Sequence, residues 1–336
     1  MRFLGLCTAL LVGCGSSSSS PPPGHGDAGS HRDAASPDTG AAEHDAARKA
    51  PGDAGATNDA DSAGDGSASG DAGVLAARPY TLHVPVGYDP AKATPLVVMF
   101  HGYSASGPIE ELYFQLTATS DANNFLYAYG NGLFNPLGDR YWNADNACCD
   151  FYNVPVDDVA YFDAIVADVE SKYMVDKKRI FVVGHSNGGF MSHRLACDRS
   201  STVAAIVSLA GAVWEDASQC NPTDKVSIAE VHGDADMTIF YDGGSTPEGT
   251  YPAATTTVAT WAAKNGCGTP IAPTGTTLTL DTTLPANQTV VSGFPSCPAG
   301  IDVELWTIHG GGHIPTLPYP GWGDAVWGFL SAHAKP

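Results

Sequence analysis

A serine between two glycines is the first group in the chain that could do chemistry. Residues 184–188 read Gly-His-Ser-Asn-Gly, which matches the G-x-S-x-G pattern of a serine held on a sharp turn between a strand and a helix. The chain contains 38 glycines, so a chance match is possible and the pattern needs a suitable structural context. Ser186 is therefore a candidate nucleophile that requires a base and an acid elsewhere in the chain.

Two loops downstream of Ser186 carry residues that could activate it. A serine hydroxyl needs a base to accept its proton and an acid to orient that base. One loop contains Asp234 and Asp236, and a later loop contains His309 and His313. We favour Asp236 as the acid and His313, further out on a glycine-rich loop, as the base. Asp234 and His309 are the alternatives, and the unused aspartate should cap a turn.

Acyl transfer also requires two N–H donors that stabilise the oxyanion of the tetrahedral intermediate. The backbone N–H of Asn187 directly follows the serine and should lie at a helix N-terminus. We assign the second donor to the N–H of Tyr103, in the His-Gly-Tyr turn at residues 101–103. Tyr103, Trp142 and His185 are candidate substrate contacts, although aromatic residues and a histidine beside a nucleophile equally serve as packing residues.

Neither a metal ion nor an organic cofactor is expected. His309 and His313 stand four residues apart, but three glycines separate them and the chain has no H-E-x-x-H motif. No two cysteines have the C-x-x-C spacing of a zinc site. The expected chemistry therefore depends on the side chains and backbone of the chain alone.

The elements that must position these residues begin near residue 78. Apolar runs rich in branched residues predict buried parallel strands, and they lie at 80–84, 95–100, 125–129, 179–183, 205–209, 228–231 and 303–308. One helix is predicted over 158–174, where apolar residues recur on one face, and others over 188–198 and 321–334. Alternating strands and helices indicate an α/β fold with a mostly parallel central sheet flanked by helices.

These predicted elements give Ser186 its context. The run at 179–183 leads directly into Ser186, and a helical pattern follows at once, which is the strand–turn–helix arrangement that an exposed nucleophile requires. Asp236 and His313 follow the runs at 228–231 and 303–308. Open α/β sheets place their sites at the carboxyl ends of the strands, so the three side chains should meet there.

The N-terminal part of the chain has a different composition. Residues 1–13 combine Arg2 with an apolar run too short to span a membrane, which is typical of a secretory signal peptide. The Leu-Val-Gly-Cys segment that ends at Cys14 resembles a bacterial lipobox, which implies lipidation of Cys14; a plain secretory signal is the alternative. The stretch that follows is rich in Ser, Pro, Asp, Ala and Gly, which predicts a disordered tether. We expect a signal peptide over 1–13, the lipidated cysteine and tether over 14–77, and a catalytic domain over 78–336.

Charge limits the possible partners. The formal net charge is −20, with 16 Lys and Arg residues against 36 Asp and Glu residues, which argues against binding to nucleic acid. With the signal pattern, this predicts an exported protein, either extracellular or an outer-membrane lipoprotein, that contacts a membrane only through its lipid anchor. We expect a monomer whose partner is an ester substrate.

Six cysteines remain beyond the signal and Cys14, and disulfides persist in exported domains. They are Cys148, Cys149, Cys197, Cys220, Cys267 and Cys297. We expect Cys267 to pair with Cys297, because the first ends a helical pattern and the second precedes the run at 303–308. A bond between the neighbours Cys148 and Cys149 is sterically awkward, so each should pair with Cys197 or Cys220.

Several motifs in this order resemble the polyhydroxybutyrate depolymerase and feruloyl esterase group of α/β-hydrolases, relatives of carbohydrate esterase family 1. The motifs are His101-Gly102, Trp142-Asn143-Ala144 with Cys148-Cys149, Val156-Asp157-Asp158-Val159, Gly184-His185-Ser186-Asn187-Gly188-Gly189, His232-Gly233 with Asp236, and Gly311-Gly312-His313 with Pro315. The resemblance implies an α/β-hydrolase fold with Ser186, Asp236 and His313 as nucleophile, acid and base. The chain departs from the commoner pattern at Tyr103 and at Ile314, where an aromatic residue often precedes the proline.

The resemblance implies a serine carboxylesterase that acts through an acyl-enzyme. Its expected substrates are polyhydroxybutyrate-type polyesters or feruloyl and acetyl esters of polysaccharides. An aromatic polyester hydrolase and a serine peptidase on the same fold are the enzymatic alternatives. A surface binding protein on an inactive hydrolase scaffold is the alternative outside enzymes.

Overall fold

The computed structural model describes residues 67–154 and 156–336 of the chain. The expected signal peptide, the expected lipidation site Cys14 and most of the expected tether lie outside these residues. No helix within the described ranges is long and apolar enough to cross a membrane.

The described chain forms a nine-stranded sheet in the order β1-β3-β2-β6-β7-β8-β13-β12-β11. Its strands are β1 Tyr80–His83, β2 Thr94–Phe100, β3 Leu126–Gly130, β6 Val175–His185, β7 Val203–Leu209, β8 Ser227–Gly233, β11 Ala272–Leu278, β12 Thr289–Gly293 and β13 Val303–Ile308. The six strands from β3 to β13 in this order are parallel to one another. β1 at one edge, and β12 and β11 at the other, run antiparallel to their neighbours.

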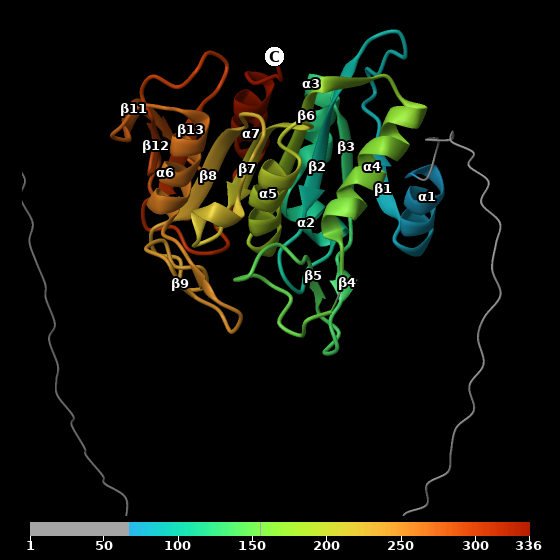
Figure 1. Ribbon diagram of the computed structural model, residues 1–336. Helices are drawn as coiled ribbons and strands as arrows, with labels where there is room; N and C mark the ends of the chain where they lie inside the picture. Colours follow the sequence, from blue (N-terminus) through green and yellow to red (C-terminus); the bar gives the residue numbers. More distant parts are fainter. Residues whose placement is uncertain (1–66, 155) are drawn as a thin grey trace, which may run out of the picture. The chain divides into compact units, whose positions relative to one another are not determined.

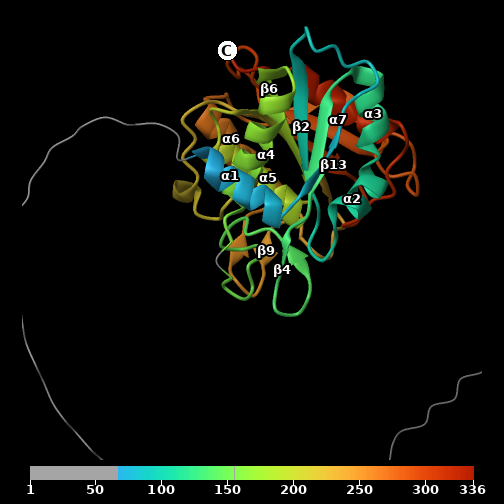
Figure 2. The ribbon, with the colours of Figure 1, turned by 90° about the vertical axis from the view of Figure 1, so that its right-hand side faces the viewer.

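Helices cover both faces of the sheet (Figures 1 and 2). They are α1 Ser67–Ala77, α2 Gly107–Phe114, α3 Leu116–Asn123, α4 Asp158–Lys172, α5 Asn187–Asp198, α6 Ala254–Asn265 and α7 Gly321–Ser331, with a short 3₁₀ turn, η1, at Ala217–Gln219. One core cluster packs α4, α5 and α6 against the sheet. A second cluster packs the ends of α2 and α3, together with α7, against the opposite face. Both faces of the central strands are thus buried, as continuous apolar runs require.

Two small hairpins lie at the end of the sheet where the central strands end (Figure 1). They pair β4 Leu133–Phe134 with β5 Arg140–Tyr141, and β9 Gly244–Ser245 with β10 Thr250–Tyr251. The sequence does not predict them, because two-residue strands are too short to show an alternating pattern.

The N-terminal boundary of the folded part differs from the expectation. Residues 67–77, expected within the disordered tether, form α1, whose Val74 and Leu75 pack against the core cluster that includes α4. The next residue, Arg78, forms a buried ion pair with Asp158 at 2.5 Å and lies over the ring of Tyr161. Apolar side chains within an otherwise polar segment therefore extend the folded part to include α1.

The disulfides correct one expectation. Cys267 pairs with Cys297, as expected. Cys197 pairs with Cys220, with their Cα atoms 5.2 Å apart, an ordinary separation for bonded cysteines. Cys148 and Cys149 are therefore bonded to each other, contrary to the expectation that each would pair with Cys197 or Cys220. The peptide bond between these two cysteines is cis.

Candidate active site

Ser186 lies on the turn between β6 and α5 in a backbone conformation that few residues adopt. Its φ is 54° and its ψ is −119°, in the positive-φ region that is costly for a residue with a side chain and that marks functional turns. Two glycines make this turn possible. A Cβ on Gly184 would collide with the carbonyl group of Gly188, and a Cβ on Gly188 would collide with that of Phe100. The G-x-S-x-G spacing is therefore a steric requirement of this turn.

The structure joins Ser186, His313 and Asp236 in one chain of hydrogen bonds. Nε2 of His313 lies 2.9 Å from Oγ of Ser186, and Nδ1 of His313 lies 2.7 Å from Oδ2 of Asp236. The serine and the histidine reach the surface only in part, and the aspartate is buried. This arrangement allows the histidine to accept the serine proton while the carboxylate fixes the imidazole tautomer.

Asp236 is held as a carboxylate. The backbone N–H groups of Thr238 and Ile239 donate to its Oδ1 at 2.7 and 3.0 Å. Burial favours the neutral acid, but hydrogen bonds with His232 and His313 outweigh burial and hold the pKa of Asp236 well below its ordinary value. Asp236 is therefore ionised throughout the pH range in which a histidine can act as a base.

The alternative pair is also hydrogen-bonded, but it stands apart from the serine. Nδ1 of His309 lies 2.8 Å from Oδ2 of Asp234, and the N–H of Gly310 donates to Oδ1 of the same carboxylate. His309 is largely exposed, with 57% of its side chain accessible. Asp234 thus caps the turn at Gly310, as the sequence predicts for the unused aspartate.

The two residues predicted to supply the oxyanion donors belong to segments next to the serine. Asn187 is the first residue of α5, so its backbone N–H has no acceptor within the helix. The turn at 101–103 lies against the nucleophile, because a Cβ on Gly102 would lie 3.6 Å from Cβ of Ser186. The N–H groups of Gly102 and Ser104 donate to Glu110 and to the carbonyl of Arg140. That of Tyr103 is the remaining candidate donor in this turn.

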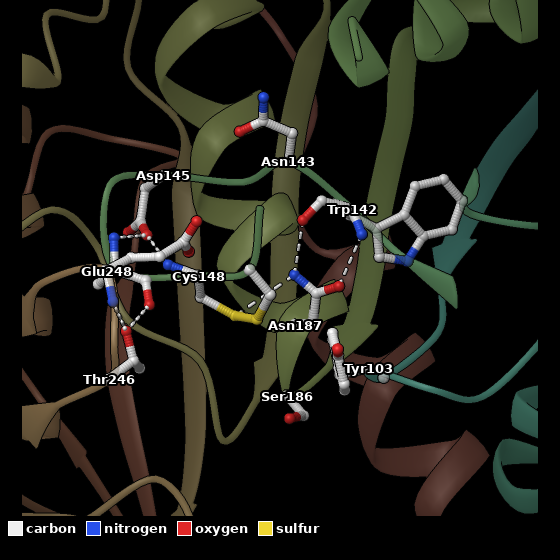
Figure 3. The surroundings of a disulfide bond; sticks show 12 residues. Tyr103, Trp142, Asn143, Asp145, Cys148, Ser186, Asn187, Thr246 and Glu248 are labelled. Atoms are coloured by element: carbon white, nitrogen blue, oxygen red, sulfur yellow. Dashed lines mark hydrogen bonds between the residues drawn. A yellow bond between two sulfur atoms is a disulfide. The ribbon is translucent and has the colours of Figure 1, made fainter. Parts of the chain in front are cut away.

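The side chain of Asn187 ties the serine turn to the segment that carries the Cys148–Cys149 disulfide (Figure 3). Its Oδ1 accepts the N–H of Trp142 at 2.7 Å, and its Nδ2 donates to the carbonyl of Trp142 at 2.9 Å. The same Nδ2 lies 3.4 Å from Sγ of Cys148. One residue therefore supplies a candidate oxyanion donor from its backbone and fixes the neighbouring loop with its side chain.

Two of the three predicted substrate contacts are buried instead. Trp142 is completely buried, and its indole N–H donates to the carbonyl of His101 at 2.8 Å. The interpretation of Trp142 as a substrate contact is therefore wrong, since an aromatic residue after a short strand can equally belong to the core. Tyr103 is half-buried, and its hydroxyl accepts a hydrogen bond from Nδ2 of Asn135 at 2.7 Å. It remains a candidate.

The third predicted contact, His185, is hydrogen-bonded to the loop that carries His313. It is 6% exposed, and its Nε2 donates to the carbonyl of His313 at 3.0 Å. Its Nδ1 lies 3.4 Å from Oε1 of Glu110, whose other oxygen accepts the N–H of Gly102 at 3.0 Å. Burial disfavours the charged imidazole, but the carboxylate of Glu110 raises the pKa of His185. Sequence reasoning misses Glu110, because nothing in the pattern of its helix distinguishes it from a solvated carboxylate.

Among the described residues, no group of three or more His, Cys, Asp and Glu side chains is arranged to hold a metal ion. The chemistry that this geometry allows is acyl transfer from a substrate carbonyl group to Oγ of Ser186.

Comparisons with known proteins agree with this geometry. A family model described as phospholipase/carboxylesterase matches residues 156–260. Feruloyl esterase B of Piromyces equi is 29% identical over 261 residues, which cover 75% of this chain and 44% of the relative. Feruloyl esterase C of Emericella nidulans is 31% identical over 180 residues, which cover 52% of this chain and 60% of the relative. The chain thus spans less than two thirds of the length of either relative.

A solved structure supports the same fold. Acetyl xylan esterase from Aspergillus awamori matches with a TM-score of 0.54 at 15% identity, covering 75% of this chain and 93% of that one. The mostly parallel sheet, the serine turn after its central strand and this structural match show that the chain has an α/β-hydrolase fold, and its sequence is similar to those of feruloyl esterases.

Proposed function

We propose that the protein is a serine carboxylesterase that cleaves its substrate through an acyl-enzyme. The observation that carries the proposal is the position of His313, within hydrogen-bond distance of both Ser186 and Asp236. A base held by a buried carboxylate and touching a serine on a strained turn is the arrangement that acyl transfer requires.

The reaction begins when Oγ of Ser186 attacks the ester carbonyl carbon and His313 accepts the hydroxyl proton. The N–H groups of Asn187 and Tyr103 would stabilise the oxyanion that develops. Collapse of this intermediate releases the alcohol, which takes the proton from His313, and leaves an ester between the acyl group and Ser186. A water molecule then attacks this ester with His313 again as base, which releases the acid and restores the serine.

For the substrate, we propose a feruloyl or acetyl ester of a polysaccharide. This part of the proposal rests on sequence similarity to proteins named feruloyl esterase B and feruloyl esterase C. A polyhydroxybutyrate-type polyester is the second substrate class that the sequence motifs suggest.

For the location, we propose an exported protein with a lipid anchor at Cys14, a tether up to α1 and a catalytic domain beyond it. The three disulfides support export, because disulfides persist in oxidising compartments. Incorporation of labelled palmitate into the wild-type protein, and its loss in Cys14→Ala, would test the anchor.

A hydrolysis screen tests the activity. The purified protein should hydrolyse p-nitrophenyl acetate and methyl ferulate, and it should release less product from poly(3-hydroxybutyrate) films. The Ser186→Ala protein is the matched control and should be inactive on all three. No turnover of any ester by the folded wild-type protein would contradict the proposal, and release from the polymer alone would overturn the proposed substrate class.

A further inference from the structure

A row of buried ionisable side chains extends from the triad into the core. Oδ2 of Asp236 lies 3.5 Å from Nε2 of His232, and Nδ1 of His232 lies 3.1 Å from Oε1 of Glu230. Oε2 of Glu230 lies 2.9 Å from Nε2 of His193. All four residues are at most 3% exposed. The proposed mechanism uses only the first of them, although burying the other three is costly unless they are paired.

The hydrogen-bond partners fix where the protons are at the inner end of this row. The indole N–H of Trp261 can only donate, and it lies 3.0 Å from Nδ1 of His193. Nδ1 of His193 is therefore an acceptor, and its Nε2 carries the proton that it donates to Glu230. The N–H of Gly211 also donates to Glu230, at 3.1 Å. A carboxyl group that receives two N–H donors is favoured in its ionised form.

The same reasoning assigns both protons of His232. The carbonyl of Ile239 can only accept, and it lies 2.8 Å from Nε2 of His232, so Nε2 carries a proton. Nδ1 faces the carboxylate of Glu230 and must carry a proton to complete that hydrogen bond. His232 is then an imidazolium between two carboxylates. Burial opposes this charge, but hydrogen bonds to Asp236 and Glu230 raise the pKa of His232 to about 9. For Glu230, burial favours the neutral acid, but the hydrogen bonds with His193 and His232 outweigh burial and lower its pKa.

We propose that His232 is a positioning residue that places a positive charge next to Asp236 at neutral pH and thereby sets the pH above which His313 can act as a base. This inference rests on the proposed function of the triad. A cation beside Asp236 draws charge away from the contact with His313 and also repels the protonated form of His313. Both effects favour the neutral imidazole that accepts the serine proton, so activity persists to lower pH than an isolated His–Asp pair would allow.

Other charged and titratable groups also lie near these two histidines. His313 faces Ser186 and Asp236, and the ring of His185, with Glu110 behind it, lies 5.1 Å from its ring. His232 faces Glu230, Asp236 and the edge of Tyr241 at 5.7 Å between rings. The Asp234–His309 pair lies on the same two loops but is largely exposed. Among these, His232 is the cation in contact with the buried carboxylate of the triad.

The test replaces the charge and keeps a hydrogen-bonding side chain. In His232→Gln, the acid limb of the pH profile of kcat/KM should move up by about one pH unit. The same shift should appear in the rate at which a fluorophosphonate labels Ser186, which reads the serine and its base without an ester substrate. A merely structural role would lower the rate at every pH and leave the limb in place.

A matched control exists at the far end of β13. His333 is 3% exposed and contacts the carbonyl of Phe329 at 2.8 Å and Oδ2 of Asp302 at 3.0 Å. His333→Gln makes the same change in a buried histidine with similar partners and should leave the acid limb unmoved. If His232→Gln does not fold, the double variant Glu230→Gln/His232→Gln removes both buried charges and should shift the limb in the same direction.

The charge itself can be observed in the wild-type protein labelled with ¹⁵N-histidine. We expect both ring nitrogens of His232 to carry protons at pH 7. A neutral His232 at this pH, or an acid limb that stays within about 0.2 pH units in a folded His232 variant, would overturn the inference. A wild-type protein that is labelled at Ser186 but hydrolyses no ester would contradict the proposed esterase and leave this test valid.

Discussion

At the level of single residues, the loop after β8 contains two aspartates and the loop after β13 contains two histidines. The extent of burial distinguishes the catalytic pair from the other pair. Asp236 is buried and is linked to Ser186 through His313, whereas Asp234 and His309 form a hydrogen bond in an exposed turn. Sequence spacing alone leaves both pairs open, because the distance between loops that follow neighbouring parallel strands depends on how each loop turns. The difference in role follows from the three-dimensional position of each side chain.

The triad should therefore respond to substitution as one unit. We expect Ser186→Ala and His313→Ala each to lower kcat by roughly 10⁶-fold, because either change removes the activated nucleophile. Asp236→Asn should lower kcat by roughly 10⁴-fold, since the imidazole loses its orientation and countercharge. The double variant Ser186→Ala/His313→Ala should be no slower than either single variant. Steady-state kinetics on p-nitrophenyl acetate provide the measurement.

Asp234→Asn and His309→Ala are the controls for these variants and should keep most of the activity. If His309→Ala lowers the activity as much as we expect of His313→Ala, and a folded His313→Ala protein keeps its rate, then His309 is the base and the assignment of His313 is wrong.

At the level of structural elements, the segment between β5 and α4 contains a buried carboxyl group, that of Asp145, whose neutral form is favoured over its charged form. Oδ1 of Asp145 accepts the N–H groups of Ala147 and Cys148 at 2.8 Å. Burial, only partly opposed by these hydrogen bonds, raises the pKa of Asp145 to about 7. Glu248 lies in the same polar cavity of about 640 Å³, where burial and the charges of Asp150 and Asp145 raise its pKa to about 7 as well.

This raised pKa predicts a pH dependence of stability with a definite sign. The folded state keeps the proton of Asp145 up to about pH 7, whereas the unfolded chain releases it near pH 4. Stability should therefore fall as the pH rises through this window and stay level above it. In Asp145→Asn, whose Oδ1 can still accept both N–H groups, the difference in unfolding free energy between pH 5 and pH 8 should shrink by about 2–3 kcal/mol.

Urea denaturation of both proteins at the two pH values gives this difference. Titrating groups that do not interact with Asp145 cancel in the comparison, whereas Glu248, whose pKa is raised in part by the charge of Asp145, contributes to the difference. Equal pH dependence in the two proteins would mean that Asp145 is ionised in the folded state.

The seven strands that the sequence predicts all occur. Six of them are parallel, and strands buried on both faces leave long apolar runs. The seventh, β1, was predicted to be a buried parallel strand, but it is an antiparallel edge strand that is only partly buried. The antiparallel strands β11 and β12 and the two hairpins were not predictable, since their residues alternate little and β11, the edge strand, is exposed along most of its length. In the site, Ser186 and its glycines carry a local signal. The buried partners Glu110 and Glu230 carry none, because a carboxylate is recognised as buried only when its neighbours in space are known.

At the scale of the whole molecule, α1 decides where the folded part begins. A chain that starts at Ser67 should have the same melting temperature as the full-length protein and the same kcat on p-nitrophenyl acetate. A chain that starts at Arg78 should melt at a lower temperature, because it lacks the packing of Val74 and Leu75. Differential scanning calorimetry of the three proteins provides the test, and equal melting temperatures would show that α1 adds nothing to the fold.

The exposed edge of the sheet has a consequence for how molecules behave at high local density. An unpaired edge strand can template pairing with a strand of another molecule. In β11, Pro273 has no N–H to offer, and the register with β12 shifts between Pro273 and Thr277, so the edge lacks the regular row of donors and acceptors that such pairing needs. Pairing between two copies of the protein through their β11 edges is therefore disfavoured, even where the copies are crowded together.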